Sequence, residues 1–67
     1  MKNGNRAIEF EMLISEAQAI GVEVMGMKYE NEQRIHLGES MAYTEDFFRN
    51  KAEEIRMITD KLRVLKV

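Results

Sequence analysis

The sequence contains no cysteine, no proline and no tryptophan, and it has one histidine among its 67 residues. The missing cysteines exclude disulfides and cysteine-based metal sites. A chain of this length forms one domain at most, here residues 1–67, and buries only about 60% of the surface of its unfolded chain. Such thin cores usually depend on disulfides, a metal or a partner subunit. A partner subunit is therefore the stabilising device that we expect.

Groups that support catalysis are also scarce. His36 has no second histidine or cysteine at metal-ligand spacing, so we expect no metal site. The sequence has no G-x-S-x-G motif and no glycine-rich phosphate loop. The adjacent acids Glu45-Asp46 and Glu53-Glu54 would diverge by about 100° on a helix and form no cation site. We predict that the protein is not an enzyme and takes no cofactor.

Hydropathy and charge restrict the partners. No apolar run reaches the roughly 18 residues of a membrane span, and none has signal-peptide length, so we predict a cytoplasmic protein. The net charge of −2 averages two unlike segments: residues 39–54 carry five acids against Arg49 and Lys51, and residues 55–67 carry four bases against Asp60. The resulting charges of −3 and +3 are typical of a helix that complements its dipole, or of an acidic surface that meets a basic partner. A nucleic-acid binder would be basic overall.

The first third of the chain predicts a helix. Apolar residues at helical spacing from Phe10 to Ile20, with alanines and glutamates between them, favour a helix over about residues 6–20. Gly21 would end it at the C′ position. Residues 8–14 also alternate between apolar and polar side chains, which is a strand pattern.

The middle of the chain predicts an antiparallel β-hairpin. Val22–Tyr29 is rich in β-branched and apolar residues, and Arg34–Leu37 alternates polar and apolar side chains. The polar residues 30–33 would form the turn between them. Gly26 would mark a bulge or a close approach of another backbone.

The last third predicts a long helix from about Thr44 to Leu65, capped by Ser40 or Thr44, with acids in its first turn. Such a helix would be roughly 33 Å long, whereas a compact chain of this size has a radius of gyration of about 11 Å. We therefore expect the helix to overhang the core and to be covered in a homodimer. The residues that we assign to dimerisation are Ile55, Ile58, Leu62 and Leu65. The complete prediction is an α+β domain with helix, hairpin and long helix.

Three methionines lie near the predicted sheet. Met25 and Met27 would share one side of the first strand, and Met41 follows the second. Methionine is flexible and fills irregular gaps in a core, or lines an adaptable binding surface. Both interpretations stay open: core filling, or an apolar groove that accepts a partner's side chain.

The segment Arg34–Met41, followed by Thr44–Phe48, is a strand, a short Glu-Ser corner and an acid-opened helix on this prediction. It resembles the corresponding corner of phage-encoded uracil-DNA glycosylase inhibitors, over about residues 22–55. The spacing of several residues is also similar to that in the short dimeric inhibitors of Bacillus phages: His36, Gly38, Ser40, Phe47, Phe48, Asn50, Ala52, Glu54 and Ile55.

The resemblance implies a DNA mimic that blocks a host uracil-DNA glycosylase without binding nucleic acid itself. Glu39 and Ser40 would engage the enzyme's DNA-clamping loops, and Glu45 or Asp46 would add a second anionic contact. The cavity for the side chain that such enzymes insert into DNA would be lined by Met25, Met27, Met41 and Phe47. The residues themselves leave two alternatives: a turn that simply caps the next helix, and a homodimeric interaction or regulatory module without DNA mimicry.

Overall fold

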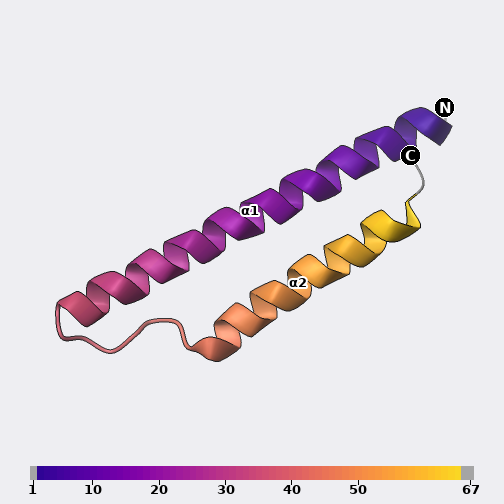
Figure 1. The fold of residues 1–67 in the computed structure, drawn as a ribbon. Helices are drawn as coiled ribbons and strands as arrows, with labels where there is room; N and C mark the ends of the chain where they lie inside the picture. The colour runs from indigo at the N-terminus through magenta and orange to yellow at the C-terminus, as the bar shows by residue number, and fades with distance from the viewer. Residues whose placement is uncertain (1, 66–67) are drawn as a thin grey trace.

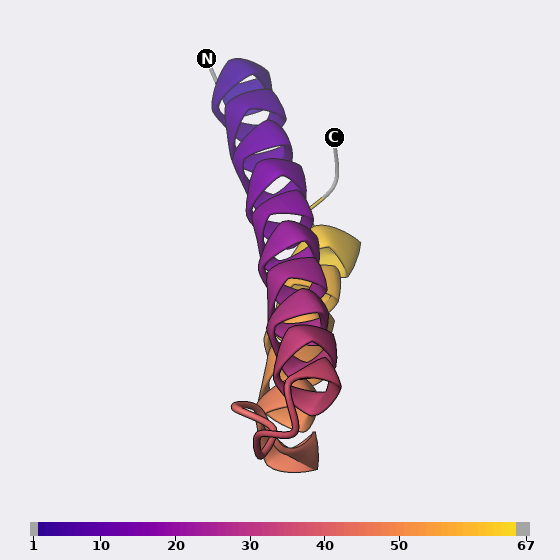
Figure 2. The same cartoon turned by 90° about the vertical axis from the view of Figure 1, so that its left-hand side faces the viewer.

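The protein is a helical hairpin. The computed structural model describes the backbone of residues 2–65 and the side chains of residues 5–65. Helix α1 spans Lys2–His36, helix α2 spans Glu45–Val64, and residues 37–44 connect them. Figures 1 and 2 show α2 running back alongside α1. Residues 2–65 contain no strand, so the predicted α+β fold is wrong and the fold is all-α.

The core is a single seam between the two helices. Leu13, Ile20 and Ile58 form its buried centre. We define the seam as Leu13, Ala17, Ile20, Val24, Met27 and Asn31 of α1 with Ile55, Ile58, Leu62 and Leu65 of α2. On each helix these positions alternate at spacings of three and four residues, the repeat that keeps one helix face against another helix.

Helix α1 continues through the region where we predicted the β-hairpin. The prediction of strands over Val22–Tyr29 and Arg34–Leu37 is wrong. Gly21, which we predicted to end the first helix, lies inside α1. Valines favour strands, and a glycine inside a helix costs about 1 kcal/mol relative to alanine. Tertiary packing outweighs these local preferences, because Val24 packs on the buried centre of the seam and Met27 is itself buried.

The glycine that does end α1 is Gly38. Its φ is +78°, a left-handed conformation that glycine adopts without a steric penalty. The N–H of Glu39 donates to the carbonyl of Arg34 at 2.7 Å, and the N–H of Gly38 donates to that of Ile35 at 3.0 Å. This pair of hydrogen bonds is the Schellman motif, which satisfies the last carbonyls of a helix.

The two glycines give a direct test of where α1 ends. We expect Gly21→Ala to stabilise the protein by about 1 kcal/mol, because alanine is the better helix former and a Cβ at this position meets no atom within 4 Å. Gly38→Ala should destabilise it by roughly 1–2 kcal/mol, because alanine is strained at positive φ. Thermal unfolding followed by circular dichroism measures both. The opposite pair of signs would mean that α1 ends at Gly21.

Helix α2 begins where the sequence predicted. Thr44 is the N-cap residue with an extended backbone, and Glu45 and Asp46 lie in the first turn. The Thr44 side chain makes no capping hydrogen bond, so the favourable interaction at this end comes from the acids near the positive end of the helix dipole. The predicted start of the helix and its acidic first turn are confirmed, and Thr44 holds the cap position without a side-chain hydrogen bond.

A buried asparagine of α1 forms hydrogen bonds to the segment that connects the two helices. The side-chain amide of Asn31 donates to the carbonyl of Tyr43 at 2.8 Å, and the N–H of Tyr43 donates to the side-chain oxygen of Asn31 at 2.9 Å. Asn31 is also buried in the seam. A single side chain therefore satisfies both backbone groups of Tyr43 and fixes the end of the connection just before α2.

The molecule is elongated, with Cα extents of 56 × 16 × 9 Å. Its radius of gyration is 16.1 Å, whereas about 11 Å is expected for a compact chain of this length. The overhang that we predicted for the C-terminal helix belongs instead to α1, which has 35 residues against 20 in α2 and extends beyond it (Figure 1). Neither helix has an apolar stretch long enough to cross a membrane, within the part of the chain that the structure describes.

Candidate protein-interaction surface

Helix α1 has a second apolar stripe outside the seam. We call it the outer face and define it as Ile8, Met12, Ser15, Ala19, Val22, Gly26 and Tyr29. The first six of these positions each lie five residues before a seam residue. Five residues correspond to a rotation of about 140° on an α-helix, so the outer face lies about 140° around α1 from the seam. All are exposed, and Val22 and Tyr29 are 69% and 70% accessible.

The outer face has bulky ends and a narrow middle. Ile8 and Met12 lie towards the N-terminus, and Val22 and Tyr29 lie in the second half with Met25 beside them. Ser15 and Ala19 separate the two groups, and Gly26 lies between Val22 and Tyr29. Small side chains and glycine allow another backbone to approach closely. The small residues of the face therefore leave room for another helix to approach closely.

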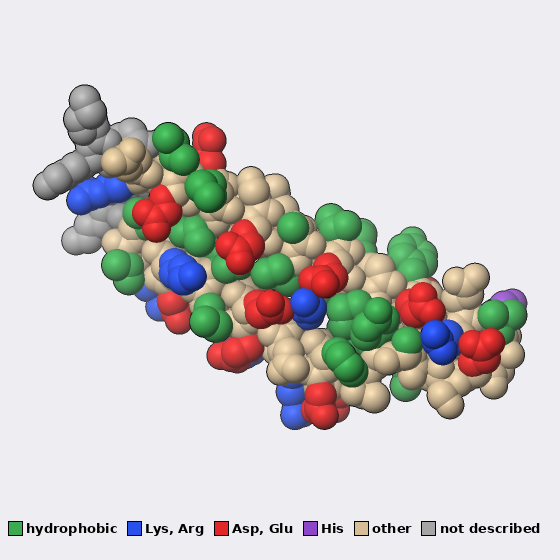
Figure 3. Space-filling model, turned by 180° about the vertical axis from the view of Figure 1, so that it is seen from behind, with side chains coloured by type: hydrophobic (Ala, Val, Ile, Leu, Met, Phe, Trp, Pro, Cys, Tyr) green, Lys and Arg blue, Asp and Glu red, His purple; other side chains and the backbone are tan. Residues whose placement is uncertain are grey.

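Glutamates flank the outer face along both margins. One margin carries a glutamate at every seventh residue: Glu9, Glu16, Glu23 and Glu30. The other margin carries Glu11 and Glu32. Six glutamates and one lysine give residues 7–33 a net charge of −5. Figure 3 shows acidic side chains in a row along α1, with hydrophobic side chains above them at its upper margin.

A groove of about 430 Å³ lies at the closed end of the hairpin. Its lining residues are Glu23, Gly26, Met27, Tyr43, Phe47 and Lys51. The rings of Tyr43 and Phe47 meet edge to face with centroids 5.6 Å apart. The Lys51 ammonium lies 2.8 Å from the carboxylate of Glu23 and 3.2 Å from that of Glu54. Hydrogen bonds to Glu23 and then Glu54 raise the pKa of Lys51 above its usual value.

The predicted cavity methionines do not line one cavity. Met27 is buried and lines the closed-end groove together with Phe47. Met25 is 57% exposed and lies beside Tyr29. It points away from Met27, because residues two apart diverge on a helix although they share a side of a strand. Met41 is exposed on the connection between the helices. The groove therefore brings together two of the four residues that we assigned to the cavity.

The predicted Glu-Ser corner lies in the connection, after a helix instead of a strand. Glu39 and Ser40 are both exposed. The Glu39 carboxylate is 3.8 Å from the Arg34 guanidinium, which also pairs with Glu30 at 2.9 Å. Glu45 and Asp46 begin α2, and Glu45 pairs with Arg49 at 2.8 Å.

Ion pairs neutralise most of the acidic segment over residues 39–54. Besides Glu39 and Glu45, Glu53 pairs with Arg56 at 2.8 Å and Glu54 pairs with Lys51. Asp46 is the remaining acid, and it has no ion pair within residues 5–65. The acids of this segment are therefore mostly paired with bases, of which Arg34 and Arg56 lie outside residues 39–54.

The four residues assigned to dimerisation are seam residues. Ile58 is buried, and Ile55, Leu62 and Leu65 pack around it against α1 of the same chain. The apolar stripe of α2, which we expected a second subunit to cover, is thus covered by α1. The signal that indicated the true arrangement was the three-and-four spacing of α1, which passes through Gly21 without interruption.

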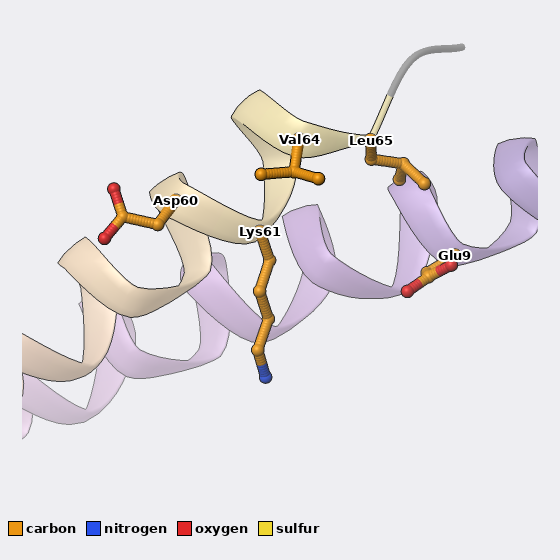
Figure 4. Close-up of a pocket in the computed structure, with 5 residues that line it drawn as sticks. All are labelled: Glu9, Asp60, Lys61, Val64 and Leu65. Carbon is orange, nitrogen blue, oxygen red and sulfur yellow. The ribbon is translucent and has the colours of Figure 1, made fainter.

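A further hollow lies at the open end of the hairpin (Figure 4). It is lined by Glu9 of α1 and by Asp60, Lys61, Val64 and Leu65 of α2. The charged ends of Asp60 and Lys61 point in different directions, and the Glu9 carboxylate meets neither of them in this view (Figure 4). Side chains that do not converge form no reaction centre, so this hollow offers no catalytic arrangement.

Comparisons with known proteins returned no similarity. No protein-family model matches the sequence, and no curated protein and no solved structure matches it.

Proposed function

We propose that this chain is a non-enzymatic protein-interaction module, in which the seam holds the hairpin together and the outer face of α1 binds another protein. The observation that carries the proposal is that α1 is apolar on two sides, whereas α2 covers one of them. A helix with apolar side chains around most of its circumference is ordinarily buried on more than one side. The location that we propose is the cytoplasm.

The chemistry of the polar residues supports a binding role. His36 is exposed at the end of α1, and no group of three or more metal-ligating side chains occurs within the described residues. Lys51 is held in its charged form by Glu23 and Glu54, so it carries no free electron pair for use as a base or nucleophile. Both observations favour a surface that is used for contact.

Photo-crosslinking from matched positions tests the proposal. Met25 beside the outer face and Met57 on the outer side of α2 are both 57% exposed. Each is replaced in turn by a photoreactive phenylalanine analogue, and the protein is irradiated in the cells that make it. We expect a discrete adduct with another protein from position 25 and none from position 57. Equal adducts at both positions, or none at position 25, would contradict the proposal.

Inhibition of uracil-DNA glycosylase remains a prediction from the resemblance. The strand that the resemblance required is replaced by helix, and the acids of residues 39–54 are mostly paired, so the interaction-module alternative has the stronger support. An excess of this protein either suppresses uracil excision or leaves it unchanged, and that assay decides the question. The homodimer also remains a prediction. The residues that we assigned to it pack against α1 of the same chain, so a dimer would have to use another surface.

A further inference from the structure

We infer that the partner of the outer face is an amphipathic helix whose apolar stripe is flanked by lysine or arginine. This inference rests on the proposed function and adds the chemical nature of the partner. It is argued from two properties of α1, the length of the apolar stripe and the sign of the charges beside it, and from the exposed area of the whole molecule.

The apolar stripe has the length and regularity of a helix-binding surface. It runs from Ile8 to Tyr29, roughly 33 Å along α1. Its three-and-four spacing is the one that two packed helices share, so apolar residues of a second helix stay in contact along the whole stripe. An extended peptide would lose this match, because its side chains repeat every two residues.

The flanking charges define which helix fits. Glu9 and Glu16 on one margin, and Glu11 and Glu32 on the other, have no ion pair among the side chains of residues 5–65. Positions beside the apolar stripe set partner choice through charge in paired helices. Four unpaired carboxylates therefore favour a partner with bases on both sides of its stripe.

The same charges disfavour a second copy of the chain on this face. In an antiparallel pair, the row Glu9, Glu16, Glu23 and Glu30 would face itself, since equivalent margins meet. In a parallel pair, this row would face the margin that carries Glu11 and Glu32. Like charges at such positions are destabilising and act against a wrong partner. An anionic lipid surface is disfavoured for the same reason.

The area of the molecule is sufficient for a specific complex. Its accessible surface is 5660 Å², whereas a compact protein of its mass, 7.9 kDa, would expose about 4400 Å². The difference is larger than the roughly 800 Å² that each partner contributes to a standard interface. Covering the outer face with one helix would bring the chain towards the exposed area of an ordinary small protein.

Two synthetic helices that differ only in charge test the inference. Each has about 22 residues, with leucine at spacings of three and four. Lysine and arginine flank the leucines in one peptide, and glutamates flank them in the other. Binding to the intact protein is measured by isothermal titration calorimetry at low and at high salt. We expect 1:1 binding of the basic peptide, at least tenfold weaker in high salt, and no binding of the acidic one.

Variants locate the binding on the outer face. Val22→Glu should weaken the basic peptide at least tenfold, whereas Met57→Glu, an equivalent change on the outer side of α2, should leave it unchanged. Glu16→Lys should weaken binding of the basic peptide and strengthen binding of the acidic one. A loss of binding with Met57→Glu as well would indicate attraction to the protein as a whole, and would overturn the inference.

The remaining outcomes separate the inference from the proposed function. If the acidic peptide binds as tightly as the basic one, or if neither binds while position 25 still crosslinks to a protein, the chemistry inferred for the partner is wrong and the module stands. If sedimentation shows a dimer that Val22→Glu dissociates, the occupant is a second copy. If neutral lipid vesicles bind and Val22→Glu abolishes this, the occupant is a membrane. Absence of both crosslink and peptide binding removes both proposals.

Discussion

Replacing Ile58 by alanine is expected to unfold most of the protein at room temperature. Ile58 is 4% exposed and lies at the centre of the seam. Truncation of a buried isoleucine to alanine costs about 2–5 kcal/mol, from lost burial and from the cavity that remains. Domains of this size rarely have more than about 3–5 kcal/mol of stability in total. The measurement is helicity at 222 nm with chemical denaturation in urea.

The control for Ile58→Ala is Met57→Ala, one residue earlier and about 100° around α2, outside the seam. Met57 is 57% exposed, so its truncation should change the free energy of unfolding by less than about 0.5 kcal/mol. Equal losses from the two variants would mean that α2 does not pack on α1 through the seam. An intact Ile58→Ala protein would mean that another interaction holds the hairpin.

Replacing Asn31 by alanine is expected to cost about 2–4 kcal/mol, since two hydrogen bonds are lost and two backbone groups of Tyr43 are left without their partner. Asn31→Asp should also destabilise the protein, because its carboxylate can accept from the Tyr43 N–H but faces the Tyr43 carbonyl as a second acceptor. Exposed Gln33, half a turn further along α1, supplies the control in Gln33→Ala.

Hydrogen exchange distinguishes a local from a global effect of Asn31→Ala. The Tyr43 amide should exchange faster by more than the unfolding equilibrium alone predicts, since this amide loses its acceptor directly. Amides in the middle of α2 should change only with global stability. Unchanged protection of the Tyr43 amide in Asn31→Ala would show that the asparagine does not fasten the connection in solution.

The sequence pattern was sufficient for α2 and for the first half of α1. Both stretches combine helical spacing with good helix formers, so local preference and tertiary packing agree. They disagree from Val22 onward, where β-branched residues and Gly26 indicate a strand. The helical spacing of apolar residues does continue from Ile20 through Val24 and Met27. A prediction that treats each glycine as the end of an element gives this spacing too little weight.

The candidate surface was missed for the same reason. Ile8 and Tyr29 lie on one face only if the helix is unbroken between them, and a predicted turn at Gly21 separates them. The acidic margin was hidden likewise, since Glu9 and Glu30 are three heptads apart. The sequence therefore indicates an acidic surface at residues 39–54, whose charge is evident from local composition and is mostly paired in the structure.

The seam and the outer face share no residue, although both belong to α1. Substitutions at separated positions without common partners usually have additive effects. If the outer face binds a partner as proposed, fold stability and partner choice can vary independently in this chain: changes at Ile8, Val22 or Tyr29 would alter what is bound, and changes at Leu13 or Ile20 would alter the stability of the hairpin. On the proposed function, a single helix would then serve as an adaptable scaffold, on which a new specificity can arise without loss of the fold.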